Sequence, residues 1–228
     1  ELRQHLNLSH PFNVENGAAL YLPKSDFKKP VNSHEDDDCW VIGFSWSRSY
    51  WCLQLAEMAA LLPGCFTRFS VMGIGEIARV TGLSIPKAAL ANKREYSEPV
   101  WFFGKTEEKV KFRELAKERG ATILEGGRFW HLTNGFDKGD AVKWLLSYFG
   151  ANESDMHIFS VALGDSHNDL GMLKVVDYPV LVKSPVHDFP EFEAPNLMTT
   201  GQFGPNGWNE ALHQLIPELL NNTTVRGN

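Results

Sequence analysis

The chain has 228 residues, of which 43% are hydrophobic and 22% charged, a balance typical of a globular protein with a buried core. Its formal net charge of −6 argues against a nucleic acid as partner, because nucleic-acid-binding domains carry an excess of basic residues. No apolar run reaches the roughly 18 residues of a membrane helix, and the first ten residues lack the pattern of a signal peptide. Cys39, Cys52 and Cys65 are odd in number and lack CxxC spacing, so we expect free thiols in a cytoplasmic protein without a membrane partner.

The N-terminal part of the chain contains one conspicuous polar segment. Residues 24–38, KSDFKKPVNSHEDDD, combine many charges with one proline and predict an exposed connector. Their acidic end, Glu35 to Asp38, resembles a cluster of metal ligands, but consecutive carboxylates repel one another and rarely converge on one ion. We interpret this end as solvated.

The central part of the chain predicts strands alternating with helices. Apolar periodicity and turn residues give strands at 41–45, 99–104, 121–126 and 128–133, and helices at 49–62, 76–81, 84–93 and 107–120. Ser84 is a plausible N-cap with Pro86 in the first turn after it, and Gly120 closes the last of these helices.

A boundary near residues 132–140 is followed by a second alternating pattern. It consists of a helix at 138–149, a strand at 158–163, a short helix at 168–176 and a strand at 178–182. A strand that returns through a helix to another strand indicates a parallel sheet. We therefore predict the α/β class, with a Rossmann-like parallel-sheet core formed by residues 1–36 and 134–228. An inserted α/β cap at 37–133 interrupts this core.

The stretch VALGDSHNDLGML (161–173) ends a predicted strand in a cluster of polar residues. Asp165 and Asp169 lie where parallel sheets bind ligands, beyond the carboxyl ends of their strands. Together they offer oxygen ligands to a hard divalent cation, and Asn168 helps to orient them. Alternatively, Asp165 or Ser166 caps the helix and Asp169 favours its dipole. Two carboxylates and an amide exceed what one cap requires, which favours the metal site.

Lys138 lies in the first turn of its predicted helix, after the good N-cap residue Asp137. A cation there opposes the helix dipole by about 0.3–1 kcal/mol. A bound phosphate reverses this effect, because the lysine and the free N–H groups both attract an anion. The alternative is a surface lysine. We predict that Lys138 binds phosphate and that its removal slightly stabilises the unliganded protein.

GDSHND and the upstream DKGDAV resemble the last two motifs of the haloacid dehalogenase superfamily of phosphatases, and the chain is similar to the mannosyl-3-phosphoglycerate phosphatase family within it. The segments PFNVENGAALY (11–21), EIARVTGLS with KREYSEP (76–99), GGRFWHL (126–132) and GPNGW (204–208) extend this resemblance over nearly the whole chain.

The resemblance implies Mg²⁺-dependent hydrolysis of mannosyl-3-phosphoglycerate to mannosylglycerate, a compatible solute, through an aspartyl-phosphate. It assigns the metal to Asp165 and Asp169 and the catalytic phosphate contact to Lys138, while the supporting role of Asn168 rests on its position beside the two aspartates. Arg94 and Arg128 become candidates for the glycerate carboxylate, with a surface salt bridge as the alternative for each. His131 is a weaker candidate, with a structural role as its alternative.

The chain departs from the family pattern at its first motifs. The family has a strand ending in DxDGT, which supplies the nucleophile, and a later strand ending in a phosphate-binding Ser or Thr. Neither occurs in these residues, and Asp36–Asp38 cannot substitute because we expect no strand before them. We therefore expect the chain as given to lack its nucleophile segment and to be inactive. Two other functions stay open: a phosphatase of another sugar phosphate, and a non-catalytic protein that binds a phosphorylated ligand.

Overall fold

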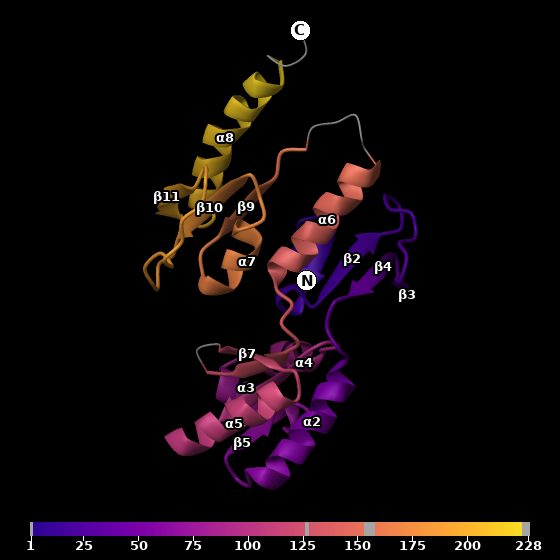
Figure 1. Cartoon of the computed structure of the whole chain (residues 1–228), viewed down its shortest axis with the longest axis vertical. Coiled ribbons are helices and arrows are strands. Elements are labelled where there is room, and N and C mark those ends of the chain that lie inside the picture. The colour runs from indigo at the N-terminus through magenta and orange to yellow at the C-terminus, as the bar shows by residue number, and fades with distance from the viewer. Residues whose placement is uncertain (1, 126–127, 153–157, 225–228) are drawn as a thin grey trace. The chain divides into compact units, whose positions relative to one another are not determined.

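The computed structural model describes residues 2–125, 128–152 and 158–224 of the chain (Figure 1). The chain divides into two compact units, Glu1–Phe136 and Asp137–Asn228, and each is described here by itself. Within the described residues, no helix combines the length and apolar character needed to cross a membrane.

The first unit begins with the short helix α1 (Leu2–His5) and an antiparallel sheet of four strands. These are β1 (Phe12–Val14), β2 (Ala19–Pro23), β3 (His34–Asp36) and β4 (Cys39–Gly43), in the order β1-β2-β4-β3. The 3₁₀ turn η1 (Glu15–Gly17) connects β1 to β2. Ala18, Ala19 and Val41 pack with Tyr96 in the buried core of this part.

The strand β3 corrects the interpretation of residues 24–38 as a connector throughout. All three residues of β3 are exposed, yet they pair with β4 and form an edge of the sheet. An edge strand needs only one hydrogen-bonding neighbour, and charged residues are common there because they discourage pairing with other chains. The expectation that no strand precedes Asp37 and Asp38 is therefore wrong, although this strand is an exposed edge.

The remainder of the first unit is an antiparallel sheet with four helices. Its strands are β5 (Phe66–Arg68), β6 (Glu98–Phe102), β7 (Thr122–Glu125) and β8 (Trp130–Thr133), in the order β5-β6-β8-β7. Its helices are α2 (Arg48–Leu61), α3 (Ile74–Thr81), α4 (Ile85–Asn92) and α5 (Thr106–Glu118). Trp51 and Met58 of α2 pack with Phe112 of α5 and Trp130 of β8 in one buried cluster. The predicted helices are confirmed to within a few residues, including Pro86 in the first turn of α4.

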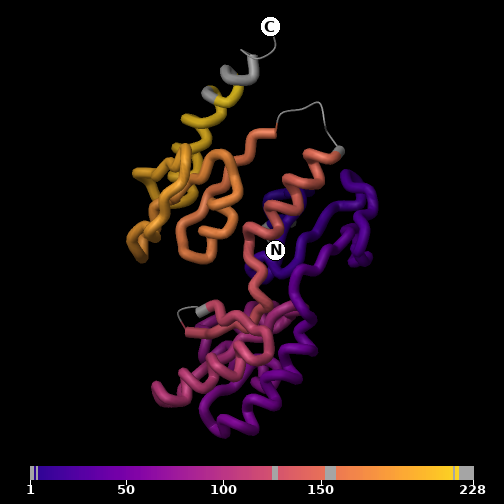
Figure 2. The backbone as a smooth tube through the Cα atoms, in the orientation of Figure 1, coloured from indigo at the N-terminus to yellow at the C-terminus, as the bar shows by residue number. Residues whose placement is uncertain are grey.

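The second unit contains the predicted parallel sheet. Its elements are α6 (Lys138–Asn152), β9 (Val161–Gly164), the 3₁₀ turn η2 (His167–Asp169), α7 (Leu170–Leu173), β10 (Tyr178–Lys183), β11 (Met198–Phe203) and α8 (Asn206–Thr224). The strands are parallel in the order β11-β10-β9. Helix α8 runs along β10 and β11 (Figure 2), where Ala211 and Leu215 bury Val180 and Val182. Leu173 packs with Ala162 and Leu181 in a second cluster. The α/β class and the parallel sheet are thus confirmed.

The division into core and cap remains a prediction. The predicted boundary between residues 36 and 37 lies between β3 and β4, which are paired strands of one sheet. We propose that the inserted cap begins after β4 instead. The second predicted boundary, between residues 133 and 134, lies three residues before the division between the two compact units.

Candidate functional site

The turn after β9 brings Asp169 back against the end of its own strand. The Oδ2 atom of Asp169 accepts hydrogen bonds from the N–H groups of Asp165 and Ser166, each at 3.1 Å, and from the Ser166 hydroxyl at 3.0 Å. A Cβ atom on Gly164 would collide with the Asp169 side chain. The glycine in GDSHND is therefore required for this close approach.

Lys138 completes the hydrogen bonding of Asp169. Its Nζ atom lies 2.5 Å from the Oδ1 atom of Asp169, so both carboxylate oxygens have donors. Asp169 is only 4% exposed, and burial opposes its ionisation. The hydrogen bond and charge of Lys138, with the hydrogen bonds from Ser166, outweigh burial and lower the pKa of Asp169. The expectation that removal of Lys138 stabilises the protein stays a prediction that this ion pair does not favour, because the removal leaves a buried carboxylate without its counter-ion.

The start of α6 is held by a cap and a close helix contact. The Asp137 carboxylate accepts a hydrogen bond from the Gly139 N–H at 2.7 Å, which confirms Asp137 as the N-cap. The Asp140 carboxylate in turn accepts one from the Asp137 N–H at 3.1 Å. A Cβ atom on Gly139 would meet the Gly171 backbone, and one on Gly171 would meet the Asp137 side chain. The two glycines let α6 and α7 approach closely enough to fix Lys138 beside Asp169.

Asp165 is half-buried at the same strand end. Within the described ranges, no hydrogen bond or ion pair engages its carboxylate, in contrast to that of Asp169. The described residues contain no group of three or more His, Cys, Asp or Glu side chains that would enclose a metal. Mg²⁺ does not need such a cage, since it keeps several waters and uses one or two carboxylates with phosphate oxygens. Asp165 therefore fits one position around Mg²⁺, while the donors around Asp169 favour a role in holding Lys138.

The candidate substrate residues of the first unit lie in different surroundings. Arg94 is three-quarters buried and faces Glu15, with 3.5 Å between its Nη1 atom and the Oε2 atom of Glu15. Arg128 is exposed, and its guanidinium donates a hydrogen bond to the Val80 carbonyl. Burial and the nearby Arg94 charge, partly offset by Glu15, lower the pKa of His131 to about 4. His131 is therefore a neutral imidazole near pH 7.

Comparison with known proteins finds relatives that are similar to this chain over most of its length. Residues 88–188 match the model of haloacid dehalogenase-like hydrolases. A glucosyl-3-phosphoglycerate/mannosyl-3-phosphoglycerate phosphatase from Persephonella marina is 31% identical over 225 residues, which cover 96% of this chain and 80% of that protein. A phosphatase of the same name from Methanococcoides burtonii is 34% identical over 213 residues, 92% of this chain and 78% of that protein. The chain belongs to this phosphatase family.

Solved structures place this phosphatase-family chain in the haloacid dehalogenase fold. A Thermoplasma acidophilum protein matches with a TM-score of 0.56 and 19% identity, covering 93% of this chain and 75% of that one. A sugar phosphatase of haloacid dehalogenase subclass IIB matches with a TM-score of 0.56 and 15% identity, covering 94% and 78%. Members of the family are phosphoric monoester hydrolases. The family resemblance expected from the sequence is thus confirmed.

One residue of the phosphatase-family chain escaped the sequence analysis. Glu15 makes several polar contacts with the segment 94–97, although 79 or more positions separate them in the chain. The only local sign of Glu15 in the sequence is the turn-like stretch ENG. In the structure, Glu15 and Asn16 of this stretch both have positive φ, 50° and 62°. Positive φ is uncommon outside glycine and points to a position held by its surroundings.

Proposed function

We propose that this protein is a Mg²⁺-dependent phosphatase that hydrolyses mannosyl-3-phosphoglycerate to mannosylglycerate and phosphate. The observation that carries the proposal is the Lys138–Asp169 ion pair beside Asp165, at the carboxyl end of a parallel strand. The printed names of the two relatives support the substrate. Because both names include the glucosyl compound, glucosyl-3-phosphoglycerate is the second candidate substrate.

In the proposed reaction, Lys138 binds the transferring phosphoryl group. Its ammonium neutralises charge on the phosphoryl oxygens. Asp169 keeps this ammonium in place, and the N–H groups of Asp165 and Ser166 in turn hold the Asp169 carboxylate. Mg²⁺ would neutralise further charge on these oxygens, with Asp165 as its ligand and Asn168 supporting the site. The initial assignment of Asp169 to the metal stays a prediction that the donors around its carboxylate do not favour.

Formation of an aspartyl-phosphate requires an attacking carboxylate. The 228 residues contain no DxDGT motif, so we propose that the nucleophile lies outside them and that this chain alone is inactive. Recognition of the sugar and glycerate is assigned to the cap, with Arg94, Arg128 and His131 as candidates. The cytoplasm is the proposed compartment, consistent with the free thiols of the three cysteines.

Turnover with Mg²⁺ tests the proposal. The substrates are mannosyl-3-phosphoglycerate, glucosyl-3-phosphoglycerate and p-nitrophenyl phosphate. The enzymes are the 228-residue protein and a version extended by the coding sequence upstream of Glu1. In an active version, Lys138→Ala should lower kcat by roughly 10²–10³-fold, a range typical of one lost charge-stabilising donor.

Lys143→Ala is the matched control, because Lys143 lies on the same helix and is 61% exposed. It should leave turnover unchanged. Equal turnover of the Lys138 variant and the wild type would refute the assignment of Lys138. Comparable turnover of the 228-residue and extended versions would place the nucleophile within the present residues. A protein that binds the phosphorylated sugar in both versions but never hydrolyses it would be a ligand-binding protein.

A further inference from the structure

Four consecutive residues, Arg94–Ser97, form a receptor for one carboxylate, which we call the 94–97 receptor. The N–H groups of Glu95 and Tyr96 donate to the Oε1 atom of Glu15 at 2.8 and 3.3 Å. The Ser97 hydroxyl donates to its Oε2 atom at 2.5 Å. Arg94 supplies the positive charge and also donates to the Ser97 hydroxyl at 2.8 Å. Backbone N–H groups, a hydroxyl and a guanidinium that converge in this way are typical of anion-binding sites.

Glu15 reaches the 94–97 receptor from a distant and strained position. It lies in the turn between β1 and β2, and its φ of 50° lies in the left-handed region. That conformation is unfavourable for a non-glycine residue, because its Cβ atom comes too close to the following carbonyl oxygen. Departure of the Glu15 side chain would permit the turn to relax. The strain therefore lowers the free energy needed to replace Glu15 by another carboxylate.

Glu15 does not satisfy all the hydrogen-bond donors of the 94–97 receptor. The 3.5 Å between Arg94 and Glu15 is an ion pair rather than a short two-pronged contact. In the described part of the chain, the buried Nε atom of Arg94 has no hydrogen-bond partner. A buried donor without an acceptor is destabilising, so a carboxylate that also reaches Nε would bind this arginine better.

We propose that the 94–97 receptor binds the carboxylate of the substrate's glycerate group, and that Glu15 is an internal competitor which this carboxylate displaces. The identity of the ligand rests on the proposed function, since phosphoglycerate esters carry a carboxylate that simple hexose phosphates lack. Exchange of one carboxylate for another leaves the two N–H groups and the hydroxyl satisfied in both states. Without substrate, Glu15 protects the receptor from other anions. Arg128 is not part of this receptor.

Amide chemical shifts measure the exchange without any turnover. D-glycerate is titrated into the ¹⁵N-labelled protein, and the N–H signals of Glu95 and Tyr96 are followed. In Glu15→Ala the receptor is open, so the apparent dissociation constant of glycerate should fall by about tenfold if the wild type is open one tenth of the time. The methyl ester of glycerate, which has no charge, should not shift these signals in either protein.

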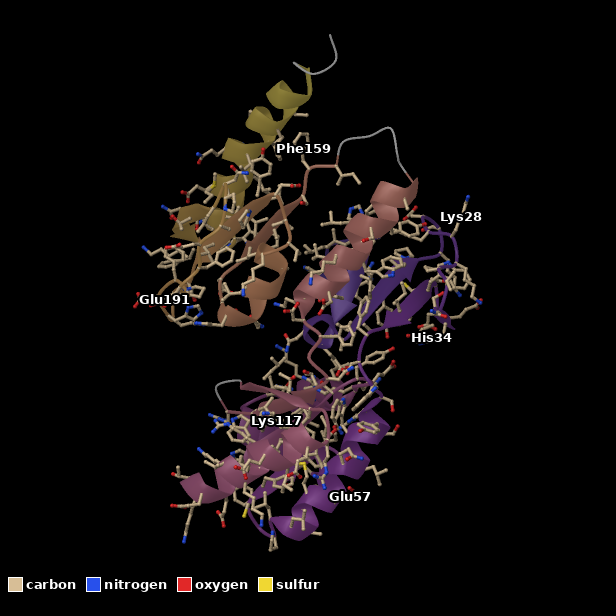
Figure 3. The ribbon with its side chains drawn as sticks, viewed as in Figure 1. Lys28, His34, Glu57, Lys117, Phe159 and Glu191 are labelled. Carbon is tan, nitrogen blue, oxygen red and sulfur yellow. The ribbon has the colours of Figure 1, made fainter. Side chains whose placement is uncertain are left out.

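Three variants complete the test. Glu15→Gln keeps the size of the side chain and should also tighten binding, which covers the case that Glu15→Ala unfolds. Ser97→Ala removes one donor and should weaken binding. Glu57→Gln is the matched control, because Glu57 on α2 (Figure 3) is exposed and forms an ion pair with Arg119 in the same unit. It should bind glycerate as the wild type does.

Unchanged or weaker binding in both Glu15 variants would overturn the proposal, because Glu15 would then be a fixed part of the fold. Glycerate that shifts none of the receptor signals in any variant would overturn it as well. The phosphatase assignment fails separately, through loss of p-nitrophenyl phosphate hydrolysis, since that substrate has no carboxylate and does not depend on the receptor.

Discussion

The two units each contain a partly buried cation paired with a carboxylate, and the pairs differ in how the carboxylate is held. Asp169 receives its hydrogen bonds from its own turn and from Lys138 at 2.5 Å. Glu15 receives its bonds from a segment about 80 positions away and lies 3.5 Å from Arg94. Apart from the bond with Lys138, the Asp169 carboxylate is held by its own local turn. The second pair joins two segments that are distant in the sequence.

The difference fits the proposed roles, in which Asp169 is a fixed support of Lys138 and Glu15 is an exchangeable occupant of the 94–97 receptor. All polar atoms of the Asp169 carboxylate have partners, and the backbone around it is packed too closely for an extra methyl group. Around Glu15, one arginine donor has no partner in the described ranges and the backbone is strained. A fully satisfied network is rigid, whereas a partly satisfied one has something to gain from a ligand.

The largest expected difference between the pairs is in stability. Asp169→Ala leaves Lys138 without its counter-ion and two N–H groups without an acceptor, so the free energy of unfolding should fall by about 3–5 kcal/mol. Glu15→Ala also leaves Arg94 and two N–H groups without their acceptor, but it should cost about 1–2 kcal/mol less, because relaxation of the turn releases the backbone strain at residue 15. Urea unfolding combined with amide hydrogen exchange in each unit measures both losses. Equal losses would mean that the two carboxylates are equally structural.

The next largest expected difference is in the pH at which each unit loses stability. His131 has a folded pKa of about 4 and an unfolded pKa near 6.5, so the unfolded state binds the proton first as the pH falls. The first unit should therefore lose up to about 3 kcal/mol of stability between pH 6.5 and 4. Asp169 has a lowered pKa, so its contribution is lost only as the pH falls below its ordinary value near 4. Unfolding of His131→Gln as a function of pH should lack the first loss and keep the second.

The rigidity of the Lys138–Asp169 region can be tested with one methyl group. Gly171→Ala places a Cβ atom against the Asp137 carboxylate, and such overpacking typically costs about 1–3 kcal/mol. Gly150→Ala in α6 is the control, because no atom lies within 4 Å of its added Cβ, and it should be neutral or stabilising by about 0.5–1 kcal/mol. Thermal unfolding of both variants measures the contrast. Equal melting temperatures would mean that α6 and α7 adjust freely.

The smallest expected effect concerns the cap that orients Lys138. Asp137→Ala removes the hydrogen bond to the Gly139 N–H and should cost about 1 kcal/mol. Ser84 occupies the same position in α4, but its side chain makes no cap hydrogen bond, so Ser84→Ala should cost less. Urea midpoints of the two variants give the comparison. A larger loss at Ser84 would contradict the assignment of these caps.

The features that could be predicted from the sequence are those that depend on local residue patterns. Alternating strands and helices, the N-cap at Asp137 and the polar cluster after β9 all follow from spacing and residue type over a few positions. The strand β3 was missed because an exposed edge carries no apolar alternation. The elements β11 and α8 were also missed. Glu15 was missed because its partners are distant in the sequence, and the ion pair of Lys138 was missed because Asp169 lies 31 positions away.

Half of the donors in the 94–97 receptor are backbone N–H groups, and this affects how mutagenesis would map it. An alanine at position 95 keeps its N–H group, so an alanine scan would report that this position is unimportant. A proline there deletes the donor and changes nothing in the charge of Arg94 or the hydroxyl of Ser97. The same reasoning applies to sequence differences among related proteins. The side chain at position 95 can differ between them while the backbone N–H group still binds the carboxylate. A proline scan, or a backbone ester in place of the amide, would reveal what side-chain substitution cannot.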